Sequence, residues 1–445
     1  MTFSSDPSSL PGDPALSVDV AIVGGGPAGL MAAEVLSQAG VSVHLFDAMP
    51  SVGRKFLLAG KGGLNLTHSE EPHLFRTRYG AQQDQVASWL SQMDAQGVRD
   101  WAHSLGVDTF VGTSGRVFPL EMKAAPLLRA WLQRLRHPAS GVPVRFHMRH
   151  RWQGWDGDHL VFQNTGAEGV RRVSACATLL ALGGASWPRL GSDGSWVPVL
   201  EEQGVSIASL QPANCGFDVT GRDGQGWTEH FRSRFAGHAL KSVALRVDAL
   251  SSSARLAENQ PAEAPMSPRF ERKGEFVITD SGVEGSLVYA ASALLRDDLA
   301  QGPAHFRLDL LPDKTLAQVQ NQVQWPRGSR SLSSHLKSRL GIDGVKMGLL
   351  YELCSPQTLA QPEALAASLK GLAISLQKPR PVAEAISTAG GVRRSAVTPE
   401  GMLLRRPGVY CAGEMMDWEA PTGGYLLTAC LASGRAAGLG ILTNL

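Results

Sequence analysis

The chain has 445 residues, of which 43% are hydrophobic and 18% charged, a balance that supplies a buried core and excludes a disordered polyampholyte. At this length we expect more than one domain. The net charge is only +2, so any case for nucleic-acid binding has to rest on a local patch.

The cysteines and the N-terminus exclude further classes. The five cysteines are odd in number, widely spaced and without a CxxC pair, which argues against a disulfide framework, a zinc ribbon or an iron–sulfur site, and we expect no metal. Residues 1–17 are Ser- and Pro-rich and lack the features of a signal peptide, so we expect a flexible tail. No apolar run approaches the roughly 18 residues that span a bilayer. We expect a soluble cytoplasmic protein without a membrane partner, assumed to be a monomer.

The first folded element is predicted to be a βαβ unit. Residues 18–23 read as a buried strand, 30–38 as a helix of small and apolar residues, and 41–46 as a second strand. Strand, helix and strand fit within about thirty residues, which is the form of a dinucleotide-binding site.

The turn of this unit carries the strongest local signal. In the GxGxxG pattern Gly24 permits the tight turn, Gly26 lets a pyrophosphate approach the backbone, and Gly29 lets the helix pack on the strand. Asp47 follows the second strand, where a carboxylate accepts hydrogen bonds from an adenosine ribose. The alternative is a Gly-rich turn in an ordinary α/β domain. The predicted cofactor-binding residues here are Gly24, Gly26, Pro27, Ala28, Gly29 and Asp47.

Residues 51–70 are dense in glycine and polar residues, too irregular for a helix and too polar for a core strand. Arg54 and Lys55 could neutralise a pyrophosphate or a reduced flavin, and the alternative is a solvated basic loop. Gly62, Gly63 and Asn65 are the further candidate cofactor contacts of this segment.

The rest of the chain divides by pattern. Helices are expected at 85–105 and 126–136, meander strands at 142–148 and 159–163, and an apolar strand at 176–182 that ends in the candidate cofactor residues Gly183 and Gly184. Short alternating runs then indicate a β-rich insertion, 251–267 an exposed loop, and 315–348 a polar helical stretch. The predicted domains are a cofactor-binding domain (18–197 and 384–445), a β-rich insertion (198–312 and 347–383) and a helical subdomain (313–346).

The C-terminal segment favours FAD over NAD as the dinucleotide. A strand at 408–412 leads into Gly413 and Glu414, and an acid after a strand can bond ribityl hydroxyls. Asp417 follows, and a helix that starts near Gly423 and Gly424 can aim its dipole at the flavin. These five residues complete the predicted FAD site.

Several motifs together resemble the BaiN/RdsA family of flavoproteins, the YhiN-like group. They are GGGPAGLMAAE, GRKFLLAGKGGLNLTHSE, ALGGASWPRLGSDG, STAGGV and AGEMMDWEAPTGGY, and they cover the chain apart from its first residues. The resemblance implies an α/β fold with a discontinuous Rossmann-type FAD-binding domain, an inserted β-barrel and a small helical subdomain. Family members are described as NAD(P)H- and FAD-dependent reductases, some similar to enone reductases of bile-acid intermediates and others to dihydrouridine synthases of ribosomal RNA.

The chain departs from the family pattern in several places, as expected of a divergent branch. Many relatives read GxGRCN where this chain has Gly63 and Leu64 before Asn65, so chemistry that needs that cysteine cannot be carried over. Cys215, at the start of the insertion, is the candidate catalytic residue, because a thiol there could protonate the carbon opposite the one that receives hydride. The competing and favoured interpretation is a buried small hydrophobe.

We therefore expect an FAD-dependent oxidoreductase that uses NADH or NADPH as a transient electron donor to reduce an activated C=C bond of a small molecule. One alternative is an RNA-directed reductase of the dihydrouridine synthase type, and another is a non-catalytic flavin redox sensor. The RNA alternative depends on two basic clusters. Their residues are Arg116, Lys123, Arg129, Arg134, Arg136, Arg145, Arg149 and Arg151, and then Arg327, Arg330, Lys337, Arg339 and Lys346 with His335 among them.

Overall fold

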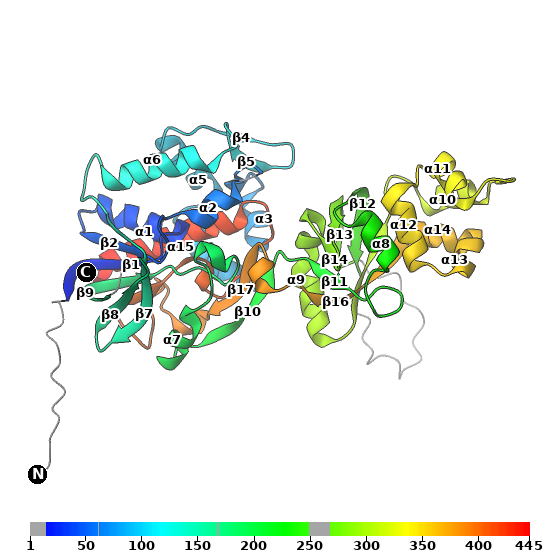
Figure 1. Cartoon of the computed structure of the whole chain (residues 1–445). Coiled ribbons are helices and arrows are strands. Elements are labelled where there is room, and N and C mark those ends of the chain that lie inside the picture. Colours follow the sequence, from blue (N-terminus) through cyan, green and yellow to red (C-terminus); the bar gives the residue numbers. More distant parts are fainter. Residues whose placement is uncertain (1–14, 61, 167–168, 249–267) are drawn as a thin grey trace, which may run out of the picture. The chain divides into compact units, whose positions relative to one another are not determined.

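The structure, a computed structural model, describes residues 15–60, 62–166, 169–248 and 268–445. It divides into two compact units, the first ending at Gln211 and resuming at Ser387, and the second running from Pro212 to Ile386 (Figure 1). The predicted exposed loop 251–267 and most of the predicted tail lie outside the described residues, although residues 16 and 17 of that tail already belong to the first strand.

A seven-stranded sheet forms the centre of the first unit. Its parallel part has the order β6-β2-β1-β9 with β18 beside β9, and β8 and β7 continue it as an antiparallel meander. The strands are β1 (Leu16–Val23), β2 (Val43–Asp47), β6 (Arg145–Met148), β7 (His150–Asp156), β8 (His159–Asn164), β9 (Val170–Leu180) and β18 (Val409–Cys411). The run Val20–Val23 is almost fully buried, as expected of a strand covered on both faces.

The prediction of a meander strand at 142–148 was wrong. β6 pairs in parallel with β2, not antiparallel with β7. The chain between β2 and β6 is long enough for several helices, and a connection of that kind allows a parallel crossover, whereas a short turn enforces antiparallel pairing.

Helices cover the sheet. α1 (Pro27–Gln38) and the long C-terminal α15 (Tyr425–Asn444) lie side by side against the parallel strands (Figure 1). The segment expected to be too irregular for a helix contains the short α2 (Arg54–Ala59), and the expected helix 85–105 is two helices because Asp94 caps the second by accepting from Gly97 N at 2.8 Å. The other helices are α3 (Pro72–Thr77), α4 (Gln83–Leu90), α5 (Ala95–Ser104), α6 (Ala124–Arg136) and α7 (Trp196–Glu202).

Two small sheets complete the first unit. β3 (Thr67–His68), β5 (Arg116–Pro119) and β4 (Thr109–Val111) form one, and β10 (Ile207–Ala213) pairs with β17 (Ser387–Val392) in the other. This second pairing keeps residues 198–211 with the first unit, so the unit boundaries fall at 211/212 and 386/387 rather than at the expected 197/198 and 383/384.

The second unit is built on a closed six-stranded barrel, which confirms the expected inserted β-barrel. Its strand order is β11-β14-β13-β12-β15-β16, and α9 (Ser286–Gln301), which the sequence analysis did not predict, packs against β13. The strands are β11 (Phe217–Val219), β12 (Ala239–Val247), β13 (Phe270–Ile278), β14 (Gly282–Glu284), β15 (Ala304–Asp309) and β16 (Leu372–Pro379), and α8 (Glu229–Phe235) follows β11.

The helical part of the second unit extends well past its expected end at residue 346. It consists of α10 (Leu316–Gln324), α11 (Leu332–Leu340), α12 (Gly344–Leu353), α13 (Pro356–Ala360) and α14 (Pro362–Gly371). The expectation of β structure from 347 onward therefore fails until β16. A short apolar run fits a buried strand and a buried helix equally well. Here the run forms a helix that packs closely on α8 at Gly348, where a Cβ would lie 2.4 Å from the Phe235 ring.

α15 also corrects the expectation that no apolar run could span a bilayer. Among the described helices it alone is long and apolar enough to cross a membrane. Its side chains Leu431, Ala432 and Ile441 lie fully buried in the core of the first unit, and that burial accounts for its composition.

A histidine pair on the sheet predicts pH-dependent stability. His147 of β6 lies 3.0 Å from His44 of β2 (Nε2 to Nδ1), and burial, followed by the charges of His44 and Arg171, lowers the pKa of His147 from 6.5 to about 4. The unfolded chain therefore binds the proton first, so stability is complete above about pH 6.5 and falls as the pH drops toward 4. Because the site is partly exposed, we expect a loss of only about 1–2 kcal/mol.

Urea unfolding between about pH 7.5 and pH 5.5 measures this dependence. His147→Gln should flatten it, whereas His159→Gln, at the end of β8, is the matched control and should leave it unchanged. An equal slope in wild type and His147→Gln would contradict the assignment.

Candidate cofactor site

A cavity opens at the carboxyl edge of the parallel sheet. The turn Gly24–Ala28, the end of β2 with Asp47, and Arg54 and Lys55 of α2 form one side of it. Residues 181–183 after β9, residues 190–193, and Ala412–Glu414 after β18 form the other. Ligands of doubly wound sheets bind in this place, outside the carboxyl ends of the strands.

The three glycines of the fingerprint play different parts. Gly24 has φ +108°, and a Cβ there would lie 2.3 Å from the Ala181 carbonyl oxygen, while a Cβ on Gly29 would lie 2.0 Å from the Gly24 carbonyl oxygen. Both are therefore required by the fold. Gly26 differs, because it caps α1 without a side-chain hydrogen bond and a Cβ there would meet no atom within 4 Å. Gly26 thus faces open space in front of the first N–H groups of α1.

Asp47 joins β2 to this turn. Its Oδ2 accepts from Gly25 N at 2.8 Å and its Oδ1 from Met49 N at 2.7 Å. Burial raises the pKa of the carboxyl, and these two N–H groups and nearby Arg54 partly offset that effect. The side chain lines the cavity, in the position expected of a ribose-binding acid.

Lys55 and Glu414, predicted separately from distant motifs, form an ion pair with 2.7 Å between Nζ and Oε2. Lys55 Nζ also donates to Ser186 Oγ at 2.6 Å, and Glu414 Oε1 accepts from Thr388 N at 3.0 Å. Glu414 is only 6% exposed. This ion pair therefore ties α2, the segment after β9, β17 and the segment after β18 together at the cavity wall.

Three buried polar atoms of residues in the cavity lining have no hydrogen-bond partner among the described residues. They are Arg54 Nε, Trp152 Nε1 and Ser192 Oγ. A buried donor without a partner is costly and usually marks a missing ligand or water. Together with the open helix end at Gly26 they fit a dinucleotide, because its phosphate and ribose oxygens accept hydrogen bonds from such donors.

The sequence analysis missed the far wall of the cavity. Arg151 of β7 binds Asp193 with 2.8 Å between NH1 and Oδ2, next to Ser192. Although burial raises the pKa of Asp193, its hydrogen bonds from Arg151 and Ser195 outweigh burial and lower it. The only signal for these residues was the Ser-Asp pair inside the ALGGASWPRLGSDG motif.

Several predicted flavin contacts do not line this cavity. They are Gly62, Gly63, Asn65, Gly184, Asp417, Gly423 and Gly424. A Cβ on Gly184 would lie 2.3 Å from Thr388 Oγ1, and Asp417 N donates to Val392 O at 2.9 Å. Asn65 differs from the other six residues, because its buried Oδ1 has no hydrogen-bond partner among the described residues. An atom of this kind usually marks a missing ligand or water.

Gly424 has a packing role that the sequence analysis did not predict. Gly424 is the N-cap of α15 with φ +92°, and a Cβ there would lie 2.5 to 2.7 Å from the backbone of Thr67 in β3. Its lack of a side chain lets α15 start directly against β3. A substitution such as Gly424→Asp would therefore disturb this packing, and it does not isolate the effect of a charge on a cofactor.

Cys215 lies in the second unit and is 1% exposed. It belongs to the hydrophobic core cluster that also contains Phe217 and Val288. This environment matches that of a small core residue, the interpretation that the sequence favoured.

The comparisons with known proteins agree with this geometry. Residues 18–440 match the family model described as "HI0933-like protein Rossmann domain". The chain belongs to the HI0933-like family. This confirms the expected family, the Rossmann-type FAD-binding fold and the class of flavin-dependent oxidoreductase.

Among relatives of this HI0933-like chain, the 3-dehydro-bile acid delta(4,6)-reductase of Clostridium scindens is 26% identical over 94% of this chain and 98% of its own length. The ribosomal RNA dihydrouridine synthase of Haemophilus influenzae is 23% identical over 94% of this chain and 97% of its own. A solved structure with a similar fold is the 3-ketosteroid-delta4-(5alpha)-dehydrogenase of Rhodococcus jostii, with a TM-score of 0.46 and 15% identity over 96% of this chain and 97% of that one.

Proposed function

We propose that the chain is an NAD(P)H-driven, FAD-dependent reductase of an activated C=C bond in a small molecule. The observation that carries the proposal is the cavity at Gly26, which an uncapped helix end and the residues of the unpaired Arg54 Nε, Trp152 Nε1 and Ser192 Oγ line together. The bile-acid reductase among the relatives supports a C=C bond as the target. We also propose a cytoplasmic location, a monomeric state and no membrane partner.

Each part of the cavity has a separate task in this proposal. The N–H groups of α1 and the Arg54 guanidinium would hold the diphosphate. Asp47 would bind the adenosine ribose, because each of its carboxylate oxygens keeps a lone pair besides the one that accepts a backbone N–H. Glu414 would bond the ribityl hydroxyls, with its charge held in place by Lys55. When bound, FAD supplies hydride transfer between a two-electron donor and an acceptor.

The proton for the second carbon of the C=C bond must come from a group on the protein or from water. Cys215 stays our candidate, although its burial means that the thiol has to become accessible before it can act. Asn65, with its unpaired Oδ1, is a candidate to orient the cofactor or the substrate.

A second candidate function is the reduction of uridine in RNA, whose C5=C6 bond is also conjugated to a carbonyl. The ribosomal RNA dihydrouridine synthases among the relatives support it, together with a basic, aromatic surface described below. The redox-sensor alternative has less support, since both kinds of relative are named as enzymes.

Anaerobic reduction of the purified holoprotein tests the proposal. We expect NADH or NADPH to bleach the visible flavin absorbance, and a conjugated 3-oxo-steroid acid to restore it. If ribosomal RNA from cells that lack the gene restores it instead, the second candidate holds. Full flavin occupancy without bleaching by either nicotinamide would overturn the proposed electron donor.

A further inference from the structure

The loop between α10 and α11 exposes a tryptophan beside basic residues. Trp325 is 57% exposed, and the Arg339 guanidinium carbon lies 4.5 Å from the centroid of its ring. Arg339 Nε is buried without a hydrogen-bond partner among the described residues. The guanidinium therefore stacks on one face of the ring and fixes it, and the large exposed fraction leaves the rest of the ring to solvent.

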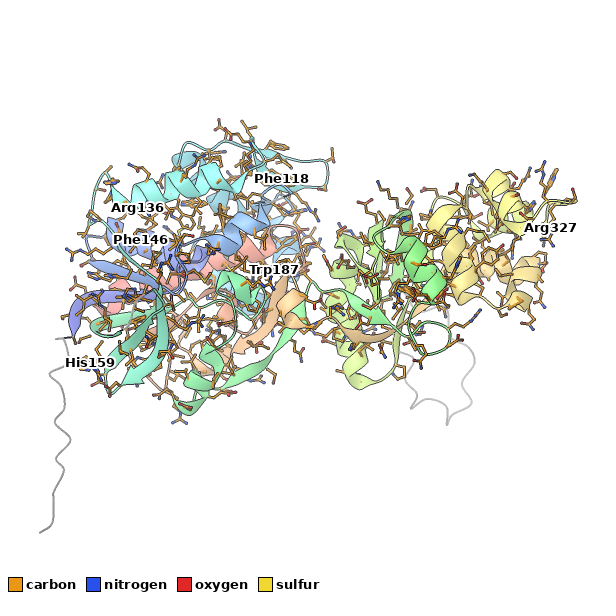
Figure 2. All side chains as sticks on the ribbon, viewed as in Figure 1. Phe118, Arg136, Phe146, His159, Trp187 and Arg327 are labelled. Atoms are coloured by element: carbon orange, nitrogen blue, oxygen red, sulfur yellow. The ribbon has the colours of Figure 1, made fainter. Side chains whose placement is uncertain are left out.

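The charge of this region is strongly biased. Residues 316–348 contain five basic side chains and a single acid, Asp343. Arg327 and Arg330 are exposed in the loop itself, and Figure 2 shows Arg327 at the outer end of the loop, pointing away from the helices. Lys337 of α11 is exposed as well, 3.1 Å from Asp343. We call Trp325, Arg327, Arg330, Lys337 and Arg339 the Trp325 surface.

Two residues of the predicted second basic cluster do not belong to this surface. Lys346 Nζ donates to the Ser242 and Leu310 carbonyl oxygens at 3.0 and 2.8 Å, and burial lowers its pKa. His335 is buried, with its Nε2 3.2 Å from the Gln322 carbonyl oxygen. Both serve the internal packing of the second unit.

A pocket adjoins the Trp325 surface through α11. It lies between α8, α11 and α12, and Lys337 is one of its lining residues together with Arg222, His230 and Arg234. Its buried acid, Glu352, already accepts from Thr228 N and Oγ1 at 2.6 and 2.7 Å. Asp343 also lines the pocket and pairs with Lys337, so the positive charge that the lining adds beside α11 comes from Arg222 and Arg234.

The first basic cluster of the chain, in the first unit, is engaged differently. Arg134 binds the buried Glu34 at 2.9 Å, Arg151 binds Asp193, and the Arg136 guanidinium lies over the Phe146 ring. Three of the eight cations of this cluster therefore have partners within the fold, and none of the three stands beside an exposed tryptophan.

We propose that the Trp325 surface binds single-stranded RNA. Unpaired bases stack on exposed aromatic rings, and their phosphates bind neighbouring cations. Trp325 would take one base, and Arg327 and Arg330 the adjacent phosphates. A duplex hides the faces of its bases and so cannot use the ring, and an acidic peptide would use the cations and leave Trp325 unused. This inference goes beyond the proposed reaction and needs no flavin.

Fluorescence anisotropy with a labelled single-stranded RNA of mixed sequence tests the inference on the full-length holoprotein. We expect Trp325→Ala to weaken binding by about 5- to 160-fold, the range for loss of one stacked base, and Trp325→Phe to keep most of the affinity. Arg327→Ala with Arg330→Ala should reduce the slope of log K against log salt by about 1.4, which is 0.7 for each phosphate of a single strand. Lys241→Ala with Arg272→Ala, two exposed cations on barrel strands, is the matched control and should change the affinity far less.

Three outcomes would overturn the inference. They are a Trp325→Ala variant that binds RNA as wild type does, a duplex that binds as tightly as the single strand and loses as much affinity in Trp325→Ala, and a polyglutamate peptide that binds as tightly as RNA. Reduction of the flavin by NAD(P)H should be normal in every variant. Its absence in wild type would count against the proposed function, and an unchanged affinity in Trp325→Ala would count against the RNA surface.

Discussion

Gly26→Val should yield a folded but colourless protein. The backbone at Gly26 has φ −81°, which a branched residue adopts, and no atom lies within 4 Å of a Cβ built there. The valine methyl groups would therefore strain nothing in the chain, but they would occupy the space in front of α1 where a diphosphate has to bind. Loss of a favourable N-cap costs about 1 kcal/mol at most. FAD released on denaturation, measured per mole of protein, should fall to the background level.

Two further glycine variants make this result specific. In Gly29→Val the Cβ would lie 2.0 Å from the Gly24 carbonyl oxygen, so that variant should lose folding as well as colour. In Gly371→Val, at the end of α14, the nearest atom lies at 3.9 Å, and FAD content should stay normal. A yellow Gly26→Val protein with full FAD content would exclude this cavity as the diphosphate site.

Glu414→Ala should be the most destabilising of the site substitutions. It leaves the Lys55 ammonium and the Thr388 N–H without their partner at a buried position. Removing one member of a buried ion pair typically costs 3–5 kcal/mol, and we expect about 3 kcal/mol because the Lys55 side chain is 25% exposed and can reach water. The measurement is urea unfolding of the FAD-free protein, since bound cofactor would add its own stabilisation.

A double-mutant cycle separates the ion pair from the rest of the Glu414 environment. Glu414→Gln combined with Lys55→Met should show a coupling free energy of about 1–3 kcal/mol. Asp156→Ala removes the partner of Arg172 in a pair whose side chains are both about half exposed, and it should cost under about 1 kcal/mol. If Glu414→Ala unfolds no more easily than Asp156→Ala, the ion pair does not hold the cavity wall together.

The first forty or so residues after the tail, from β1 to α2, show how far local patterns reach. The strand, glycine turn, helix and second strand were predicted nearly at their true bounds, because each signal lies between neighbours in the chain. The same holds for the tight turn at Gly24 and the close packing at Gly29. The short helix α2 was missed, since six residues carry too little periodicity to outweigh the glycines that flank them.

Pairing between distant segments was beyond such patterns. The parallel pairing of β6 with β2, the β10–β17 pair that sets the unit boundaries, and helices α12–α14 all depend on contacts across long separations. Periodicity identifies which face of an element is buried, but it does not identify the element that covers that face.

The sequence by itself therefore determined the glycine turn and the acid at Asp47, and it singled out Lys55 and Glu414, which line the same cavity, because residue type and spacing along a short segment suffice for each. Only the tertiary structure decided that Lys55 pairs with Glu414, that Arg54 Nε and Ser192 Oγ lie unpaired in one cavity, and that Gly424 serves packing against β3. It also left Trp325 exposed beside Arg327 and Arg330, while His335 is buried and Lys346 donates to two backbone carbonyl oxygens. The physical reason is that burial and hydrogen-bond partners are properties of the folded neighbourhood, which groups residues hundreds of positions apart.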